Sequence, residues 1–316
     1  MIELIVPLLI LAISLIILAL ASHFTIKSIE KLIKLTGLSE ASAGIVILAV
    51  MTSTPEIIVA LFSVLQGEPA ISIGDILGSN VFNFGVVLGI LGMLGYLKTC
   101  CTDLLLDLTD ILFVTSLIPL LLVTSHYHIF DVSSPIVGAI LLGTFLISVY
   151  FRTRKKTPIV NANKSAAMSE ESKKMIVAML ILSFGGVIMA SRLVVSSGIN
   201  IAGLLGAPPI LIGAKVVAIG TSLPELTLDL TAVRRGHVQM AIGDIIGSNL
   251  TNLTLVLGLV LLTSPFSVHM AVFTEILPFL LITTIIFWRF LARGGVSQVG
   301  GIALIMTYIL FQAIII

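Results

Sequence analysis

Charged residues are scarce in this chain. They make up 10% of its 316 positions, whereas a typical soluble domain carries about 25%. The net charge is only +1, which excludes a basic surface large enough to bind nucleic acid. Cysteine is also rare, and because Cys100 and Cys101 are adjacent, no disulfide framework can be built from them. Hydrophobic residues make up 58% of the chain, a composition that excludes a soluble enzyme and indicates a polytopic protein in a lipid bilayer.

Long apolar runs, bounded by charges and by clusters of glycine, proline and serine, predict ten membrane-spanning helices. We place them at 2–22, 38–65, 71–96, 107–125, 132–151, 174–195, 207–233, 241–263, 269–289 and 294–316. The expected fold class is therefore an all-α polytopic membrane protein with ten transmembrane helices.

Lysine and arginine gather in the loops on one side of these spans. Fifteen of the 17 basic residues belong to that side, and seven of them lie at 152–174. The loops on the other side carry none. Because cytoplasmic loops hold the excess of basic residues, we expect a cytoplasmic loop at 152–173 and both termini outside. The expected location is the cell (plasma) membrane.

A segment of 40 residues is repeated in the chain. Positions 50–89 match positions 219–258 without a gap, with 18 of 40 residues identical. Two motifs recur in the copies: Thr-Ser-x-Pro-Glu, at 52–56 and 221–225, and Gly-Asp-Ile-x-Gly-Ser-Asn-x-x-Asn, at 74–83 and 243–252. Matched Pro-Glu and asparagine pairs are not what a chain rich in leucine and isoleucine repeats by chance, so the sequence indicates a duplication.

The duplication divides the chain into a first repeat at 1–151, a linker at 152–173 and a second repeat at 174–316. Each repeat holds five predicted spans. Because five is odd, the second repeat enters the membrane from the opposite side. Inverted-topology repeats are typical of secondary transporters, which bind substrate near the bilayer midplane between the repeats.

Each Thr-Ser-x-Pro-Glu motif places a carboxylate deep within a predicted span. An ionisable residue at that depth is costly, so Glu56 and Glu225 are candidates for a functional site. The preceding residues, Pro55 and Pro224, cannot donate a backbone hydrogen bond. Each span should therefore break at its Thr-Ser pair and restart as a second half-helix.

The groups at the two breaks are oxygen donors. Besides the glutamates they comprise the hydroxyls of Thr52, Ser53, Thr221 and Ser222 and the backbone carbonyls freed near Ala49, Val50, Ala218 and Ile219. Oxygen donors suit a hard cation such as Ca²⁺ or Na⁺, and the motifs contain no histidine or cysteine for zinc or copper. The second motif adds further expected ligands, paired four residues apart on one helical face: Ser79 with Asn83, and Ser248 with Asn252.

The other polar residues of the second motif have structural interpretations. Asn80 and Asn249 are expected to make hydrogen bonds between helices. Asp75 and Asp244 are expected to start their helices, where a carboxylate either caps the positive end or lines the ion entrance. The two glycines of each motif should let these helices approach their neighbours closely.

These paired blocks resemble the two α-repeats of the cation/Ca²⁺ exchanger superfamily, and most closely those of its microbial Na⁺/Ca²⁺ exchanger branch. The resemblance implies alternating access, in which the first and sixth helices slide past a body of the other eight. It implies Ca²⁺ and Na⁺ as transported ions, with no cofactor and no obligatory protein partner. Carried over by position, the implied ligands are Thr52, Ser53, Glu56, Ser79, Asn83, Thr221, Ser222, Glu225, Ser248, Asn252 and the carbonyls of Ala49 and Ala218.

The sequence departs from that pattern at a few positions. Met51 stands where members of the superfamily usually have glycine, so the first break should be less open than the second. Asn252 stands where several relatives have aspartate. Asp229 has no counterpart in the pattern and either adds charge to the site or faces a vestibule. Lys215 is expected to extend towards the nearest membrane surface.

Two ionised glutamates would give the site a charge of −2, which one Ca²⁺, two Na⁺ or two protons neutralise. Because these fillings compete for the same carboxylates, they exclude one another, which suffices for counter-transport. Three alternatives stay open: H⁺/Ca²⁺ exchange, a dependence on K⁺, and a cation channel with a carboxylate filter. An enzyme is not expected, because all five histidines lie in predicted loops or at span ends.

Overall fold

The computed structural model describes residues 2–36, 50–97, 103–154, 170–264 and 268–314. Within these ranges the regular secondary structure is helical throughout, without strands, which confirms the all-α prediction. Seven described helices are long and apolar enough to cross a bilayer, and three shorter apolar helices lie at Thr54–Leu65, Ser134–Tyr150 and Gln298–Ile314. Each falls within or overlaps one of the ten predicted spans.

The described part of the first half of the chain holds eight helical segments. They are α1 (Ile2–Thr36), α3 (Thr54–Leu65), α4 (Pro69–Phe82), the π-helical η1 (Asn83–Leu88), α5 (Gly89–Met93), α6 (Asp103–Leu117), α7 (Leu120–His126) and α8 (Ser134–Arg154). The predicted span 107–125 is interrupted at Pro119, where α6 has ended and α7 begins. The start of the predicted span 38–65 lies outside the described residues.

The second half begins with α9 and ends with α16. Its segments are α9 (Glu170–Leu205), α10 (Pro209–Ile212), η2 (Gly213–Val217), α11 (Ala218–Thr221), α12 (Leu223–Arg234), α13 (Val238–Thr251), η3 (Asn252–Val256), α14 (Leu257–Thr263), α15 (Met270–Leu291) and α16 (Gln298–Ile314). The π-helical segments η2 and η3, like η1, have wider turns than an α-helix, a feature that often marks functional sites.

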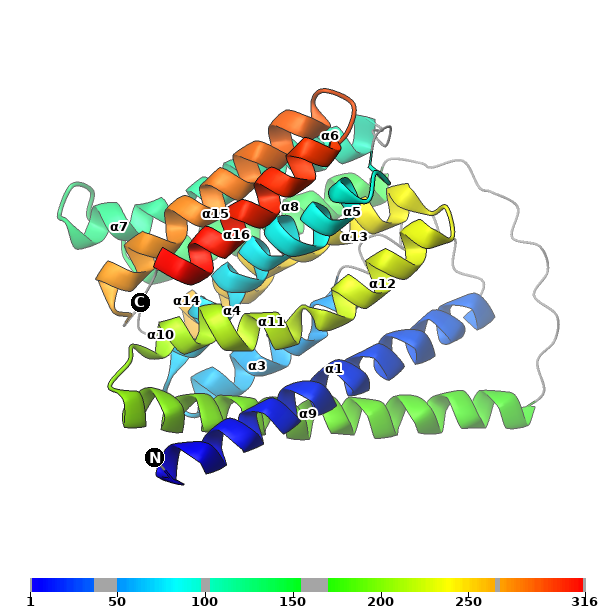
Figure 1. Ribbon diagram of the computed structural model, residues 1–316, viewed down its shortest axis with the longest axis horizontal. Coiled ribbons are helices and arrows are strands. Elements are labelled where there is room, and N and C mark those ends of the chain that lie inside the picture. Colours follow the sequence, from blue (N-terminus) through cyan, green and yellow to red (C-terminus); the bar gives the residue numbers. More distant parts are fainter. Residues whose placement is uncertain (1, 37–49, 98–102, 155–169, 265–267, 315–316) are drawn as a thin grey trace.

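Helices α1 and α9 pack along each other at one side of the molecule (Figure 1). Leu18 and Val194 of these helices belong to a second hydrophobic cluster, which also includes Ile71 of α4 and Val217 of η2, and Thr25 donates a hydrogen bond of 3.0 Å to Ser183. Most of their remaining surface is exposed and apolar, which fits contact with lipid.

The predicted ends of α1 and α9 are wrong. The sequence placed Lys27 in a loop after residue 22, but α1 continues to Thr36, and α9 continues past residue 195 to Leu205. No proline or glycine occurs at 23–36, and the backbone hydrogen-bond ladder does not stop where a helix leaves the bilayer. The change in polarity at Lys27 therefore did not mark a helix end. For the same reason His23 lies inside a helix, not in a loop.

The larger core surrounds α4 and α13. Every residue of α4 is buried, and α13 is buried from Ala241 to its end, as expected for helices that other helices enclose on all sides. α15 packs against α4 and η1, with the rings of Phe84 in η1 and Phe287 in α15 stacked 5.1 Å apart. The helices that carry the second motif are thus the centre of the body.

Glycine lets α4 lie against α10 and η2 with the two backbones in contact. A Cβ atom built on Gly74 would lie 2.0 Å from the carbonyl oxygen of Ile210, and one on Gly78 would lie 2.2 Å from that of Ala214. Gly213 meets the carbonyl of Ile71 in the same way. The predicted close approach is therefore confirmed for the first copy. Gly243 of the second copy meets Leu105 at an ordinary 3.7 Å among the described residues.

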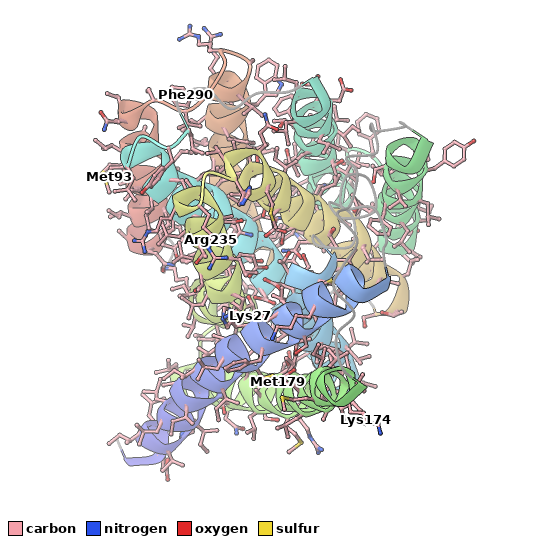
Figure 2. All side chains as sticks on the ribbon, turned by 90° about the vertical axis from the view of Figure 1, so that its right-hand side faces the viewer. Lys27, Met93, Lys174, Met179, Arg235 and Phe290 are labelled. Atoms are coloured by element: carbon pink, nitrogen blue, oxygen red, sulfur yellow. The ribbon has the colours of Figure 1, made fainter. Side chains whose placement is uncertain are left out.

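The basic segments lie at one end of the bundle. The C-terminal ends of α1, α12 and α15 and the N-terminal end of α9 lie towards the right of Figure 1, while both chain ends lie towards the left. Figure 2 looks at the end of the bundle that lies to the right in Figure 1, and Lys27, Lys174 and Arg235 are labelled there. The architecture thus keeps the predicted separation of basic loops from the termini. Lys215 lies elsewhere and donates a 2.8 Å hydrogen bond to the carbonyl of Gln312, near the end of α16.

Candidate functional site: buried oxygen donors at two broken helices

Both Thr-Ser-x-Pro-Glu motifs form helix breaks, as predicted. α11 ends at Thr221, Ser222 leaves helical geometry at φ −90° and ψ 2°, and α12 starts at Leu223 with proline in its first turn. The first copy behaves alike, since Ser53 has φ −76° and ψ 7° and α3 starts at Thr54. The kink between α11 and α12 lies beside α1 (Figure 1).

The two glutamates lie in the first turns of the restarted helices. Glu56 and Glu225 are both fully buried, and they are close enough to interact electrostatically. Glu56 also lies near the hydroxyls of Thr221 and Ser222 in the other copy. Neither carboxylate oxygen of Glu56 has a hydrogen-bond partner among the described residues. Helix N-termini favour negative charge, which offsets part of the cost of burying these two carboxylates.

The serines of the two motifs meet across the repeat. The hydroxyls of Ser53 and Ser248 are 2.9 Å apart, and Ser248 donates a longer bond of 3.4 Å to Glu225. Ser222 and Ser79, the counterparts of Ser53 and Ser248 in the other copies of the motifs, differ from them in their hydrogen bonding. Ser222 has no partner among the described residues, while Ser79 donates to the backbone carbonyl of Asp75 at 2.6 Å. The arrangement is therefore asymmetric although the motifs are repeated.

Each motif threonine donates to an aspartate of the other copy. Thr221 Oγ1 donates to Asp75 Oδ1 at 2.9 Å, and Thr52 Oγ1 donates to Asp244 Oδ1 at 3.1 Å. The prediction that these aspartates start their helices is wrong. α4 begins at Pro69 and α13 at Val238, so both carboxylates project from the helix interior, where they are buried and cap nothing.

The motif asparagines are fully buried. Asn83 donates to the side-chain oxygen of Asn249 at 3.0 Å, which confirms the predicted interhelical role of Asn249. Asn80 was expected to do the same, but neither of its polar atoms has a partner among the described residues. Asn252 and the oxygen of Asn83 also lack one there. Asn83 and Asn252 are the first residues of η1 and η3, a feature that hydrophobic periodicity does not reveal.

Of the carbonyls expected to be freed at the breaks, those of Val50 and Ala218 accept hydrogen bonds within the chain. Ala49 lies outside the described residues. The carbonyl of Ala218 accepts the backbone N–H of Ser222 at 3.2 Å and lies 3.3 Å from the hydroxyl of Thr221. That of Val50 lies 3.4 Å from the hydroxyl of Thr54. These carbonyls are thus not free of hydrogen bonds, although a carbonyl oxygen has a second lone pair.

Asp229 lies one helical turn after Glu225 and is buried, with 2% of its surface exposed. It lies near enough to Glu225 and Asp244 to interact with both electrostatically. Of the two sequence interpretations, burial favours added charge at the site over a place in an open vestibule. The first copy has Ala60 at this position, so the extra acid is confined to the second copy.

These groups define what the site can hold. The described residues include no group of three or more histidine, cysteine, aspartate or glutamate side chains arranged for a metal ion. A cation here would therefore rely on one or two carboxylates and several neutral oxygens, the donor set of Na⁺ and Ca²⁺. Buried polar atoms without partners are rare in proteins, and most of those found among the described residues belong to the two repeated motifs.

Comparison with known proteins agrees with this chemistry. A family model described as "Sodium/calcium exchanger protein" matches residues 6–154 and 175–316. The sodium/calcium exchanger MaX1 of Methanosarcina acetivorans is 28% identical over 343 residues, covering 97% of each chain. The inner membrane protein YrbG of Escherichia coli is 26% identical over 273 residues, covering 86% of this chain and 84% of its own.

Solved structures of the sodium-calcium exchanger NCX_Mj share the fold. The structure soaked with 10 mM Na⁺ and zero Ca²⁺ matches with a TM-score of 0.66 at 24% identity and covers 99% of this chain and 100% of its own. The structure soaked with 2.5 mM Na⁺ and 1 mM Sr²⁺ has a TM-score of 0.66 at 25% identity, with 97% of both chains covered.

Proposed function

The chain belongs to the sodium/calcium exchanger protein family, and from that membership we propose that it is a secondary antiporter that exchanges Na⁺ for Ca²⁺ across a membrane. The family consists of membrane ion exchangers, not enzymes. The protein itself is an integral membrane protein by its apolar helices and its family. The relatives named for sodium and calcium exchange support the choice of these two ions.

The observation that carries the proposal is the pair of buried glutamates. Glu56 and Glu225 are fully buried, lie at two helix breaks and interact electrostatically. Two carboxylates with a joint charge of −2 bind one Ca²⁺ or two Na⁺, but not both fillings together. Competition of this kind couples the two ions: where the site opens to one side, Na⁺ displaces Ca²⁺ to that side, and the Na⁺-loaded site then opens to the other.

Neutral oxygens complete the proposed site. The full ligand set consists of Glu56, Glu225, Thr52, Ser53, Ser79, Asn83, Thr221, Ser222, Ser248, Asn252 and the carbonyls of Ala49 and Ala218. The burial of all the described members supports this set, as does the partnerless state of Glu56, Ser222 and Asn252 among the described residues. Removal of a cation's water shell needs several such oxygens at once, because Ca²⁺ takes six to eight.

Alternating access would use the two repeats. We propose ten transmembrane helices in two inverted five-helix repeats, residues 1–151 and 174–316. The family model matches residues on both sides of the linker, which supports this division. In this proposal α1 and α9, which pack along each other, slide past the body formed by the other helices. In a cell (plasma) membrane, the basic end of the bundle would face the cytoplasm.

The test is ⁴⁵Ca²⁺ uptake into proteoliposomes driven by an imposed Na⁺ gradient. Glu56→Gln and Glu225→Gln should each reduce uptake to the level of empty liposomes, because a neutral amide cannot balance the cation charge. Glu275→Gln is the matched control, since Glu275 also lies within a predicted span but is exposed on α15. It should retain exchange. Undiminished uptake by both site variants would refute the proposed site.

The same vesicles separate the alternatives. A pH gradient that drives uptake without Na⁺ would replace the proposal with H⁺/Ca²⁺ exchange, and an absolute need for K⁺ would add a third ion. Uptake that follows the Ca²⁺ gradient without any counter-ion would indicate a channel. Na⁺-dependent, saturating uptake is the result that we expect.

A further inference from the structure

Two aspartates lie next to proposed ligands but are not themselves part of the proposed ligand set. Asp75 accepts the hydroxyl of Thr221 at 2.9 Å, and Asp244 accepts that of Thr52 at 3.1 Å. Both the threonines and the aspartates are 169 positions apart, the offset of the repeat. The same crossed hydrogen bond is therefore formed twice, which marks it as a feature of the repeated unit and not an accident of packing.

The fold holds Asp75 in place. Its helix α4 is buried along its whole length, and the contact with η2 is so close that a Cβ atom on Gly213 would lie 2.9 Å from the backbone nitrogen of Asp75. A carboxylate in such surroundings cannot turn towards water. It reaches Thr221 because α4 and the α10–η2–α11 segment touch through their glycines.

The threonine hydroxyl has one hydrogen and two lone pairs, and a cation can use only the lone pairs. Thr221 has other acceptors for its hydrogen, because its oxygen lies 3.3 Å from the carbonyl oxygen of Ala218 and 3.4 Å from that of Val217. Helical threonines commonly donate to such carbonyls. Donation to Ala218 would occupy a carbonyl that is itself a proposed ligand. The shorter bond to Asp75 takes the hydrogen away from both.

We propose that Asp75 and Asp244 are positioning residues for the cation site, which orient the hydroxyls of Thr221 and Thr52 so that oxygen lone pairs, not hydrogens, face the ion. Donation to a carboxylate also makes the hydroxyl oxygen more negative and therefore a better ligand. Partners of this kind typically contribute 10- to 100-fold to metal affinity although they do not touch the ion. The inference rests on the proposed cation exchange and assigns a role to residues outside its ligand set.

The test is equilibrium binding of ⁴⁵Ca²⁺ to the purified full-length protein in detergent, with Na⁺ as competitor. Asp75→Leu, which removes the acceptor at similar volume, should weaken Ca²⁺ binding about 10- to 100-fold. Asp75→Asn keeps a carbonyl acceptor and should stay within about fivefold of the wild type, because a neutral hydrogen bond is weaker than a charge-assisted one. Thr221→Val should resemble Asp75→Leu.

The double variant separates positioning from a general structural role. Because Asp75 acts through Thr221, Asp75→Leu in the Thr221→Val background should bind Ca²⁺ no more weakly than Thr221→Val alone. Size-exclusion chromatography checks that each variant is folded, and Asp75→Ala replaces Asp75→Leu if the leucine variant is not monodisperse. The second pair should behave in the same way: Asp244→Leu in the Thr52→Val background should bind Ca²⁺ no more weakly than Thr52→Val alone.

Three results would overturn the inference: wild-type affinity in Asp75→Leu, equal losses in Asp75→Asn and Asp75→Leu, or a further loss of affinity in the double variant. A wild-type protein that binds no Ca²⁺ would overturn the proposed function and the positioning role with it. The two failures are thus distinguished by the wild-type measurement.

Discussion

Single side chains of the repeated motifs face unequal surroundings. The hydroxyl of Ser53 lies 2.9 Å from that of Ser248, whereas its counterpart Ser222 has no hydrogen-bond partner among the described residues. Identical residues in duplicated motifs therefore differ in their hydrogen bonding in the folded protein. Ser53 contributes to the stability of the protein, while Ser222 is available to a ligand at no such cost.

This difference predicts the behaviour of two alanine variants. Ser53→Ala should lower the free energy of unfolding by about 0.5–1.5 kcal/mol without ions, because it removes a buried hydrogen bond. Ser222→Ala should leave that free energy nearly unchanged. Both should reduce the increase in Tm that Ca²⁺ produces, since both remove a proposed ligand. Thermal unfolding with and without Ca²⁺ measures both effects, and equal destabilisation of the ion-free variants would contradict the assignment.

Among the helices, the contact between α4 and the α10–η2 segment decides where the site residues lie. Gly74, Gly78 and Gly213 bring two backbones into contact, and Asp75 follows directly after the first of them. The sequence predicted a close approach from the spacing of Gly74 and Gly78. It could not name the partner, because a small-residue pair does not specify which helix packs against it.

Gly74→Ala tests this contact. The new Cβ atom would lie 2.0 Å from a backbone carbonyl, so the helices must separate, at a cost of about 1–3 kcal/mol of folding free energy. The displacement should also lengthen the bond between Asp75 and Thr221 and weaken Ca²⁺ binding. Chemical denaturation and ⁴⁵Ca²⁺ binding measure the two effects.

Gly143→Ala on α8 is the matched control. No atom lies within 4 Å of its new Cβ among the described residues, so the variant should be as stable as the wild type or up to about 1 kcal/mol more stable. If Gly74→Ala matched this control in stability and in Ca²⁺ affinity, the contact would not position the site.

At the scale of the whole molecule, the described helices separate basic residues from the chain ends. The basic turns lie at one end of the bundle and both termini lie towards the other (Figure 1, Figure 2). The positive-inside rule then gives the molecule a direction in the membrane.

Single-cysteine labelling tests that direction. In a Cys100→Ser, Cys101→Ser background, Ala162→Cys in the linker should react with a membrane-impermeant maleimide only after the cells are permeabilised. Asp131→Cys, an exposed position between α7 and α8, should react in intact cells. Both variants should retain Na⁺-driven Ca²⁺ uptake. The opposite pattern of labelling would show that the topology is the reverse of the one predicted. Labelling of both positions in intact cells would contradict a topology that places them on opposite sides of the membrane.

The sequence by itself determined the helical membrane class, the repeat and the two helix breaks, because each depends on local chemistry. Apolar runs partition into lipid wherever they occur, and proline removes a backbone donor whatever surrounds it. The same local reasoning failed at the ends of α1 and α9 and for Asp75 and Asp244, where the sequence marked polarity but not the position within the helix.

Only the tertiary structure decided which polar groups meet. The bonds from Thr221 to Asp75, from Thr52 to Asp244 and between Ser53 and Ser248 join residues 146, 192 and 195 positions apart. Hydrogen bonds at such separations form only where helix packing brings donor and acceptor within about 3 Å. Because these pairs are buried, the loss of either partner is costly: a polar group enclosed by helices has no water to replace the missing hydrogen bond.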